Sequence, residues 1–241
     1  MTGLRAVVFG ATGGIGAALL AQLEGSGHYD GIYAGARTLP DTAQPHTTTF
    51  RFDLTDEPSI AEAARTAGAD GPLDLAIVAT GMLHRADQPM PEKSWRALDG
   101  QAMAQMFAIN TIGPALIAKH VLPLMRRDAR SVFAVISARV GSIGDNRLGG
   151  WHSYRASKAA LNMLVRNFAI ELASRNPQGI AVAIHPGTVD SALSRPFQRS
   201  VSPGSLFTPD ESAAHIISVI DQLSASDSGS LMAWNGERIP Y

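Results

Sequence analysis

The stretch FGATGGIG, residues 9–16, decides how the first part of this chain folds. The apolar run AVVF at residues 6–9 predicts a short buried strand, and AALLAQL at residues 17–23 predicts a helix. Gly10, Gly14 and Gly16 lie on the turn between them. Such a turn lets backbone N–H groups and the helix N-terminus approach a phosphate closely, although glycine turns also occur for purely steric reasons.

Strand and helix patterns alternate along all 241 residues. Apolar runs predict strands at residues 4–9, 31–35, 48–52, 73–79, 131–137, 180–185 and 231–234. Helical spacing predicts helices at residues 15–24, 59–67, 94–110 continuing to about 125, 153–174 and 209–223. Because no linker or repeat interrupts this order, we expect one α/β domain, residues 1–241, with a doubly wound seven-stranded parallel sheet.

Composition limits the classes of partner. The net charge is −1 and no basic stripe is visible, which argues against nucleic acid. The chain has no cysteine, and its seven histidines lack metal-ligand spacing with a carboxylate, so we expect no disulfide and no metal. The first strand begins too early for a signal peptide, and no apolar run approaches the ~20 residues that span a bilayer. These features predict a cytoplasmic protein with no membrane partner.

Arg37 is the first charged residue after the second predicted strand. In dinucleotide-binding folds this position meets the adenosine ribose: an acid there suits NAD, whereas a base can pair with the 2′-phosphate of NADP. The alternative is a solvated arginine in a surface turn. The sequence favours NADP(H) over NAD(H).

Tyr154 and Lys158 lie four residues apart at the start of a predicted helix, and therefore on one face of it. An ammonium near a phenol favours the phenolate and lowers the phenol pKa from its usual value of about 10. A phenol tuned in this way can exchange a proton with a carbonyl oxygen. The pair alone is weak evidence, since this spacing also arises by chance.

The spacing Gly10-x-x-x-Gly14-x-Gly16, with Tyr154-x-x-x-Lys158 about 140 residues later, resembles the short-chain dehydrogenase/reductase family along essentially the whole chain. The phrases SARVGSI (137–143), GGWHSYRASK (149–158) and HPGTVD (185–190) are most similar to bacterial C-factor-like and sniffer-like carbonyl reductases. The resemblance implies a Rossmann-type fold and hydride transfer between a nicotinamide and a small carbonyl or alcohol substrate.

The resemblance also implies roles for single residues. Tyr154 would be the general acid/base, Lys158 would lower its pKa and bind the nicotinamide ribose, and Asn110 would hold a water in the proton relay. Cofactor contacts are expected from the following residues: Gly10, Thr12, Gly13, Gly14, Ile15, Gly16, Arg37, Asp53, Leu54, Ala79, Thr80, Gly81, Tyr154, Lys158, Pro186, Gly187 and Thr188.

Two departures from the family pattern stand out. The Asn-Asn-Ala-Gly of the family is replaced by VATG at residues 78–81, which we interpret as a structural change. Ala138 occupies the slot of the family's catalytic serine, three residues before Gly141. Ser137 could supply the hydroxyl from a shifted strand end, Ser142 could reach in from the loop, or Tyr154 could act alone. Of these, the sequence analysis selects Ser137.

The predicted activity is thus an NADP(H)-dependent oxidoreductase, with residues 187–208 as a candidate substrate lid. The alternative is a dinucleotide-binding regulatory or signalling protein with little turnover, as is proposed for C-factor-like relatives. By resemblance only, the long helices at residues 94–125 and 153–174 predict a homodimer or homotetramer.

Overall fold

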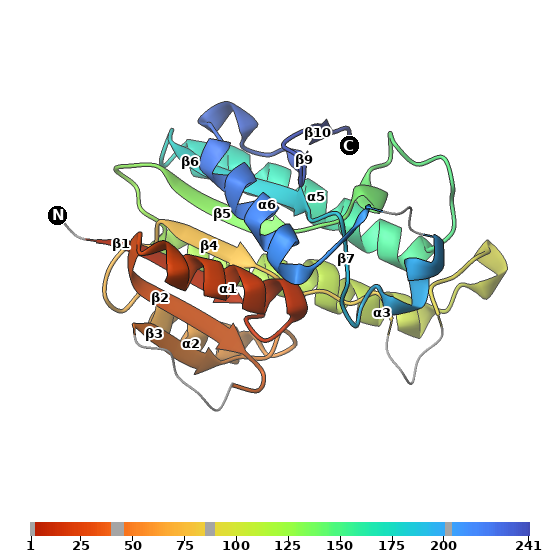
Figure 1. The fold of residues 1–241 in the computed structure, drawn as a ribbon, viewed down its shortest axis with the longest axis horizontal. Helices are drawn as coiled ribbons and strands as arrows, with labels where there is room; N and C mark the ends of the chain where they lie inside the picture. Colours follow the sequence, from red (N-terminus) through yellow and green to blue (C-terminus); the bar gives the residue numbers. More distant parts are fainter. Residues whose placement is uncertain (1–2, 40–45, 85–89, 201–203) are drawn as a thin grey trace.

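The computed structural model describes residues 3–39, 46–84, 90–200 and 204–241, and within them the chain builds a central sheet between two layers of helices (Figure 1). The sheet order is β10-β9-β6-β5-β4-β1-β2-β3. The strands are β1 (Leu4–Phe9), β2 (Tyr29–Ala36), β3 (Thr47–Arg51), β4 (Leu75–Val78), β5 (Ser131–Ile136), β6 (Gly179–His185), β9 (Leu231–Ala233) and β10 (Arg238–Ile239).

The seven predicted strands are all present and parallel, which confirms the Rossmann-type fold. The sheet has one strand more than predicted, because β10 adds an eighth, antiparallel to β9. This strand has two residues, too few for a readable alternation of apolar side chains. A separate parallel pair, β7 (Thr188–Val189) and β8 (Leu206–Phe207), lies within the predicted lid, one strand near each end of it.

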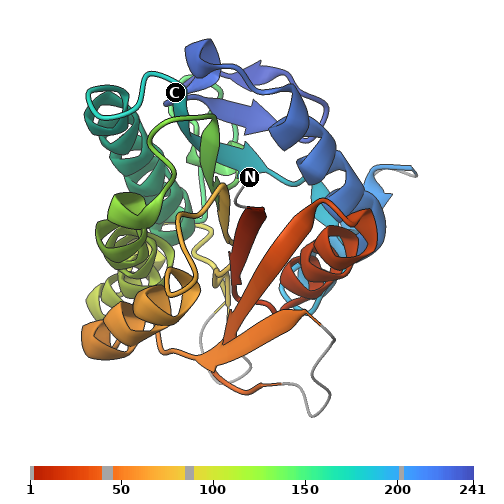
Figure 2. The same cartoon turned by 90° about the vertical axis from the view of Figure 1, so that its left-hand side faces the viewer.

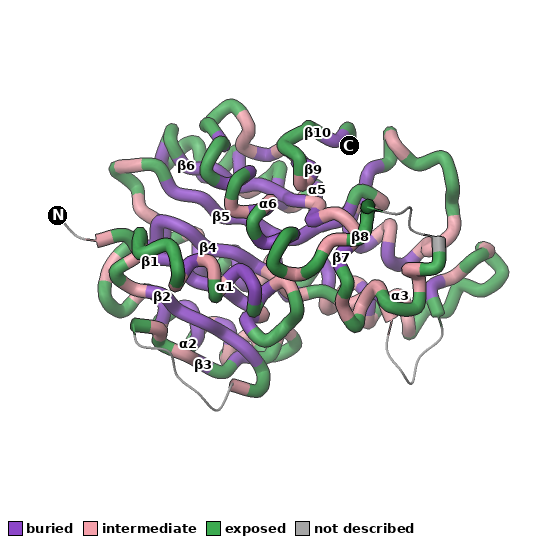
Figure 3. Tube along the Cα trace, viewed as in Figure 1, coloured by how far each residue is buried: buried purple, intermediate pink, exposed green. Residues whose placement is uncertain are grey.

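Helices cover both faces of the sheet, as Figure 2 shows end-on. They are α1 (Gly14–Ser26), α2 (Glu57–Ala67), α3 (Gly100–Phe107), α4 (Gly113–Val121), α5 (His152–Ala173) and α6 (Pro209–Gln222). Alternate residues of one strand enter opposite cores: Val7 and Phe9 face the core under α2, α4 and α5, whereas Ala6 and Val8 face the core under α1 and α6. The inner strands β1 and β5 are therefore largely apolar on both faces, and the buried segments run through the centre of Figure 3.

The helix predicted from residue 94 to about 125 is interrupted, so its prediction as one element is wrong. A 3₁₀ turn at Trp95–Ala97 precedes α3, and a π-helical turn at Ala108–Ile112 joins α3 to α4. Pro114 has no N–H to donate to the carbonyl of Asn110, four residues earlier, which helps to explain the change of register. Such turns often mark functional positions in helices.

The interrupted helix Gly100–Leu124 is, by length and composition, long and apolar enough to cross a membrane, which the sequence analysis did not anticipate. In its most apolar window 39% is buried inside the protein. Asn110 and Thr111 are buried in its middle, and α4 packs on α2 and α5. Core helices of globular domains meet the same two criteria, so the finding is weak evidence for a membrane.

The sheet order places the switch point between β1 and β4. The chain moves outward to β2 and β3 on one side of β1 and to β4, β5 and β6 on the other. In open α/β sheets ligands bind outside the carboxyl ends of the strands at this point. In Figure 1 these ends point toward α3 and β7.

The glycine turn brings α1 onto this edge. Gly10 has φ +93°, a conformation that side chains disfavour, and a Cβ built on Gly16 would lie 2.1 Å from the carbonyl oxygen of Gly10. Only a residue without a side chain lets α1 begin this close to the end of β1.

Gly16→Ala should therefore lower the free energy of unfolding by about 2–3 kcal/mol, because backbone rather than a flexible side chain opposes the new methyl group. Gly25→Ala in the same helix is the matched control: nothing lies within 4 Å of its Cβ, so alanine should be neutral or stabilise by up to about 1 kcal/mol. Denaturant unfolding measures both, and equal effects would refute the packing argument.

Candidate active site

A cavity of about 400 Å³ opens at the carboxyl edge of the sheet. Gly13, Gly14 and Ile15 line one end of it, where α1 begins without a side-chain cap. Thr80 lines the same cavity, and its buried Oγ1 has no hydrogen-bond partner among the described residues. An uncapped helix start beside an unpaired hydroxyl suits the phosphates and hydroxyls of a dinucleotide. The residues present therefore fit the predicted cofactor.

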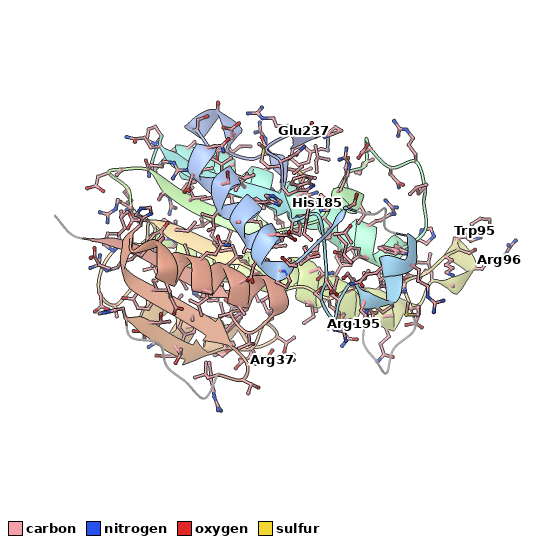
Figure 4. All side chains as sticks on the ribbon, in the orientation of Figure 1. Arg37, Trp95, Arg96, His185, Arg195 and Glu237 are labelled. Carbon is pink, nitrogen blue, oxygen red and sulfur yellow. The ribbon has the colours of Figure 1, made fainter. Side chains whose placement is uncertain are left out.

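Predicted contacts to the adenosine end lie apart from this cavity. Arg37 is exposed just beyond β2, as Figure 4 shows. Asp53 accepts hydrogen bonds from the backbone N–H (2.8 Å) and hydroxyl (2.7 Å) of Thr55, and these bonds lower its pKa, with a smaller contribution from the Arg37 charge. Thr12 is exposed on the glycine turn, whereas Leu54 packs against Gly113 at the start of α4.

Tyr154 and Lys158 both line the cavity from the first turns of α5. Burial raises the pKa of Tyr154, and burial lowers the pKa of Lys158 to about 8. The Lys158 ammonium donates to the carbonyl of Ile136 at 2.9 Å. The structure does not show the expected lowering of the Tyr154 pKa by Lys158, because burial dominates the pKa of both groups. A protonated phenol is the form that can donate a proton to a carbonyl.

Asn110, in the π-helical turn, is hydrogen-bonded to the segment after β4 and to α5. Its Oδ1 accepts from the N–H of Met82 (2.8 Å), and its Nδ2 donates to the carbonyl of Met82 (2.8 Å) and to Ser157 Oγ (3.2 Å). A Cβ on Gly81 would lie 3.6 Å from Asn110 Oδ1 and 3.7 Å from Lys158 Nζ. The fold thus brings Asn110, Gly81 and Lys158 together, as the predicted site requires.

The hydroxyls near the missing serine face away from the carbonyl site. Ala138 packs in one small cluster with Tyr154. Ser137 lines the cavity, but its hydroxyl donates to Asn162 Oδ1 at 2.7 Å. Ser142 donates to the carbonyl of Pro240 and accepts from the N–H of Asp145 at 3.0 Å. The geometry favours the third alternative, in which Tyr154 acts alone; Ser137 as carbonyl donor stays a prediction.

Aromatic side chains form the outer wall of the cavity. The ring centroid of Trp151 lies 4.9 Å from that of Phe197 and 6.3 Å from that of Tyr154, and Phe197 packs edge-on against His84 at 5.6 Å. Leu193 and Phe197 belong to the predicted lid, so the lid contributes to the wall; residues 201–203 of that range lie outside the described residues.

The sixth-strand turn forms the opposite wall. His185, Pro186, Gly187 and Thr188 all line the cavity. The carbonyl of Pro186 accepts from Ser212 Oγ at 2.9 Å, and burial lowers the pKa of His185 to about 4, which keeps its imidazole neutral. His185 Nδ1 has no partner among the described side chains. The predicted cofactor residues that line the cavity are Gly13, Gly14, Ile15, Ala79, Thr80, Gly81, Tyr154, Lys158, Pro186, Gly187 and Thr188.

Glu92 is a residue that the sequence analysis missed. Its carboxylate accepts from the backbone N–H (3.3 Å) and the hydroxyl of Ser153, and its carbonyl accepts from the N–H of Trp151 at 2.5 Å. Trp151 has φ +50°, an uncommon conformation for a bulky residue. Glu92 therefore anchors the start of α5, directly before Tyr154; no local sequence pattern announces a contact across 61 residues.

Comparison with known proteins places this chain in a family. The model of the short chain dehydrogenase family matches residues 5–201. The chain belongs to this family and is an oxidoreductase of it.

Two curated relatives illustrate the range of the family. A 1-hydroxy-2-glutathionyl-2-methyl-3-butene dehydrogenase of Rhodococcus sp. is 32% identical over 234 residues, which are 92% of this chain and 93% of that protein. The C-signal of Myxococcus xanthus is 34% identical over 175 residues, 71% of this chain and 94% of that protein.

Among solved structures, the NADPH-bound carbonyl reductase from chicken fatty liver has a TM-score of 0.82 at 26% identity, covering 100% of both chains. The carbonyl reductase Sniffer of D. melanogaster has a TM-score of 0.83 at 20% identity, again over 100% of both chains, and shows the shared fold.

Glu92→Ala should lower the free energy of unfolding by about 1–2 kcal/mol, because α5 loses the acceptor at its first turn. Glu62→Ala is the control, since Glu62 makes an exposed pair with Arg65 that contributes about 0–0.5 kcal/mol. Denaturant unfolding compares the two variants. A Glu92 variant as stable as the Glu62 variant would show that this anchor contributes nothing.

Proposed function

We propose that this protein reduces small carbonyl compounds with NADPH, with Tyr154 as the proton donor. The observation that carries the proposal is a buried Tyr154, held protonated by its surroundings, in the same cavity as Lys158 and the uncapped glycine turn. When bound, the dinucleotide supplies a hydride to the carbonyl carbon. Tyr154 then gives its proton to the carbonyl oxygen as negative charge develops there.

Lys158 and Asn110 support this proton transfer. Lys158 carries a positive charge below about pH 8, and the charge lies one helical turn from the phenol. It stabilises the phenolate that remains after the proton has left. Asn110 holds Met82 and Ser157 in place and thereby fixes the gap between the end of β4 and α5. In the reverse direction, alcohol oxidation requires the phenolate and should therefore accelerate as pH rises.

We infer a preference for NADP(H) from Arg37. Its guanidinium is exposed beside Asp53, just beyond the strand that meets the adenosine ribose in such folds. A guanidinium suits a 2′-phosphate because its N–H groups match two phosphate oxygens. The chicken carbonyl reductase, which was solved with NADPH, supports the same choice.

The second candidate function is regulation through dinucleotide binding with little turnover. Ala138 in place of the family serine favours it, as does the similarity to the C-signal. Oxidation of NADPH by the purified protein against a panel of aldehydes, ketones and quinones separates the two functions.

We further propose that two copies associate through α4 and α5. Ile112, at the end of the π-helical turn before α4, and Met163 and Ile170 in α5 expose 53%, 62% and 60% of their surfaces. Burial of such a set between two copies would remove apolar surface from water.

Tyr154→Phe should lower kcat by about 10²–10⁴-fold, because the proton donor is lost while the ring still fills its place. Binding of NADPH, measured by calorimetry, should stay within about threefold of the original, since the phenol oxygen is one contact among many. Tyr29→Phe, at the opposite end of the sheet, is the control and should keep full turnover. Parallel loss of NADPH affinity and turnover in the Tyr154 variant would contradict this role.

Arg37→Ala should weaken NADPH binding by about 10–100-fold and leave NADH binding nearly unchanged, because only NADPH carries the 2′-phosphate. Dissociation constants measured at one salt concentration test this expectation, with the exposed Arg147→Ala as the control for general loss of charge. Equal weakening of both dinucleotides would argue against a phosphate contact.

A further inference from the structure

An apolar cluster packs around Tyr154 and offers no second donor to a carbonyl on that side. Its other members are Met82, Leu83, Met106, Ala138, Val140, Trp151, Leu193 and Phe197. Elsewhere the cavity lining carries hydroxyls, among them that of Thr80, which suits the dinucleotide. Ala138 stands where the family serine would add a second hydroxyl. Ser137 and Ser142, which flank this position in the sequence, donate their hydroxyl hydrogen bonds elsewhere, to Asn162 Oδ1 and to the carbonyl of Pro240.

With a single hydrogen-bond donor to the carbonyl oxygen, the reaction depends more on the substrate's own reactivity. Negative charge develops on the carbonyl oxygen as hydride reaches the carbon, and a preorganised hydrogen bond to that oxygen is typically worth about 10²–10³-fold in kcat. When the protein supplies one such bond instead of two, the substrate itself has to stabilise more of the charge. Electron-withdrawing substituents next to the carbonyl do this.

The cavity wall sets two further requirements for the substrate, one on its shape and one on its charge. Trp151 and Phe197, whose ring centroids are 4.9 Å apart, offer aromatic surface beside Tyr154 and favour a flat ring in the substrate. The two basic side chains that line the cavity are already engaged: Arg139 pairs with Asp145 at 2.6 Å, and Lys158 donates to the carbonyl of Ile136. Among the described lining residues, Arg139 is paired with a carboxylate and the charge of Lys158 stabilises the phenolate, so a substrate carboxylate would compete for both.

We propose that Ala138 is a specificity-determining residue, which restricts this enzyme to uncharged, electron-poor aromatic aldehydes and ketones. This inference rests on the proposed function. In the reaction the carbonyl carbon gains a hydride, its oxygen takes the Tyr154 proton to give the alcohol, and the reduced dinucleotide is oxidised. Water returns the proton to Tyr154. Electron-rich or aliphatic carbonyls fit the cavity but react slowly, because a single donor stabilises their oxyanion too little.

The test is a series of benzaldehydes with para substituents from methoxy to nitro, reduced with NADPH by the original protein and by Ala138→Ser. A primary isotope effect on kcat/KM, measured with NADPH deuterated at C4, would establish that hydride transfer is rate-limiting. For the original protein, log kcat/KM should rise steeply with electron withdrawal. Ala138→Ser should raise the value for the methoxy compound by about 10-fold or more and for the nitro compound by less than about threefold.

Ser218→Ala, exposed on α6 and outside the cavity lining, is the matched control and should leave kcat/KM unchanged. Ser137→Ala tests the rival donor. It should keep kcat/KM within about threefold across the series, because its hydroxyl is bound to Asn162. Thermal unfolding of each variant verifies that it is folded.

Two results overturn the inference while leaving the proposed function intact. One is a slope that is the same in the original protein and in Ala138→Ser; the other is a loss in Ser137→Ala as large as that in Tyr154→Phe, which would identify Ser137 as the second donor. If all variants bind NADPH and none oxidises it with any aldehyde, the proposed function itself fails.

Discussion

The carbonyl of Gly10 lies so close to Gly16 that residue 16 has no room for a side chain. This contact sets where α1 begins relative to β1, and the rest of the site depends on it. It leaves the first N–H groups of α1 uncapped at the edge of the sheet, directly beside the end of β4. The switch in strand order opens a cavity at the same edge. A phosphate-binding helix start and a place for substrate thus arise from one packing constraint.

Burial governs the chemistry on the other side of the cavity. Both Tyr154 and Lys158 are driven toward their neutral forms, so their surroundings favour the proton that Tyr154 must donate and weaken the hold of Lys158 on its own proton. A raised phenol pKa suits carbonyl reduction and opposes alcohol oxidation. Because Ala138 adds no second donor, the balance between the two directions depends more on the substrate than it does in a site with two hydroxyls.

Much of the fold could be predicted from the sequence, because its signals are local. The seven parallel strands follow from apolar runs, and Tyr154 and Lys158 share a face by helical spacing alone. The break at Asn110 was harder to predict, since the π-helical turn spans only five residues, too few to show a readable change of apolar period. The contacts of Glu92 with α5 and of Ser137 with Asn162 depend on how distant segments meet, which no spacing reveals. The side-chain direction of Ser137 could not be read from its position at a strand end.

The most direct test of this account follows the hydride itself. The purified protein would reduce p-nitrobenzaldehyde with NADPH carrying deuterium at both C4 positions, and mass spectrometry would locate the label in the alcohol. The account predicts one deuterium on the former carbonyl carbon and loss of this product in Tyr154→Phe. Alcohol without deuterium, or equal product from the Tyr154 variant, would contradict it.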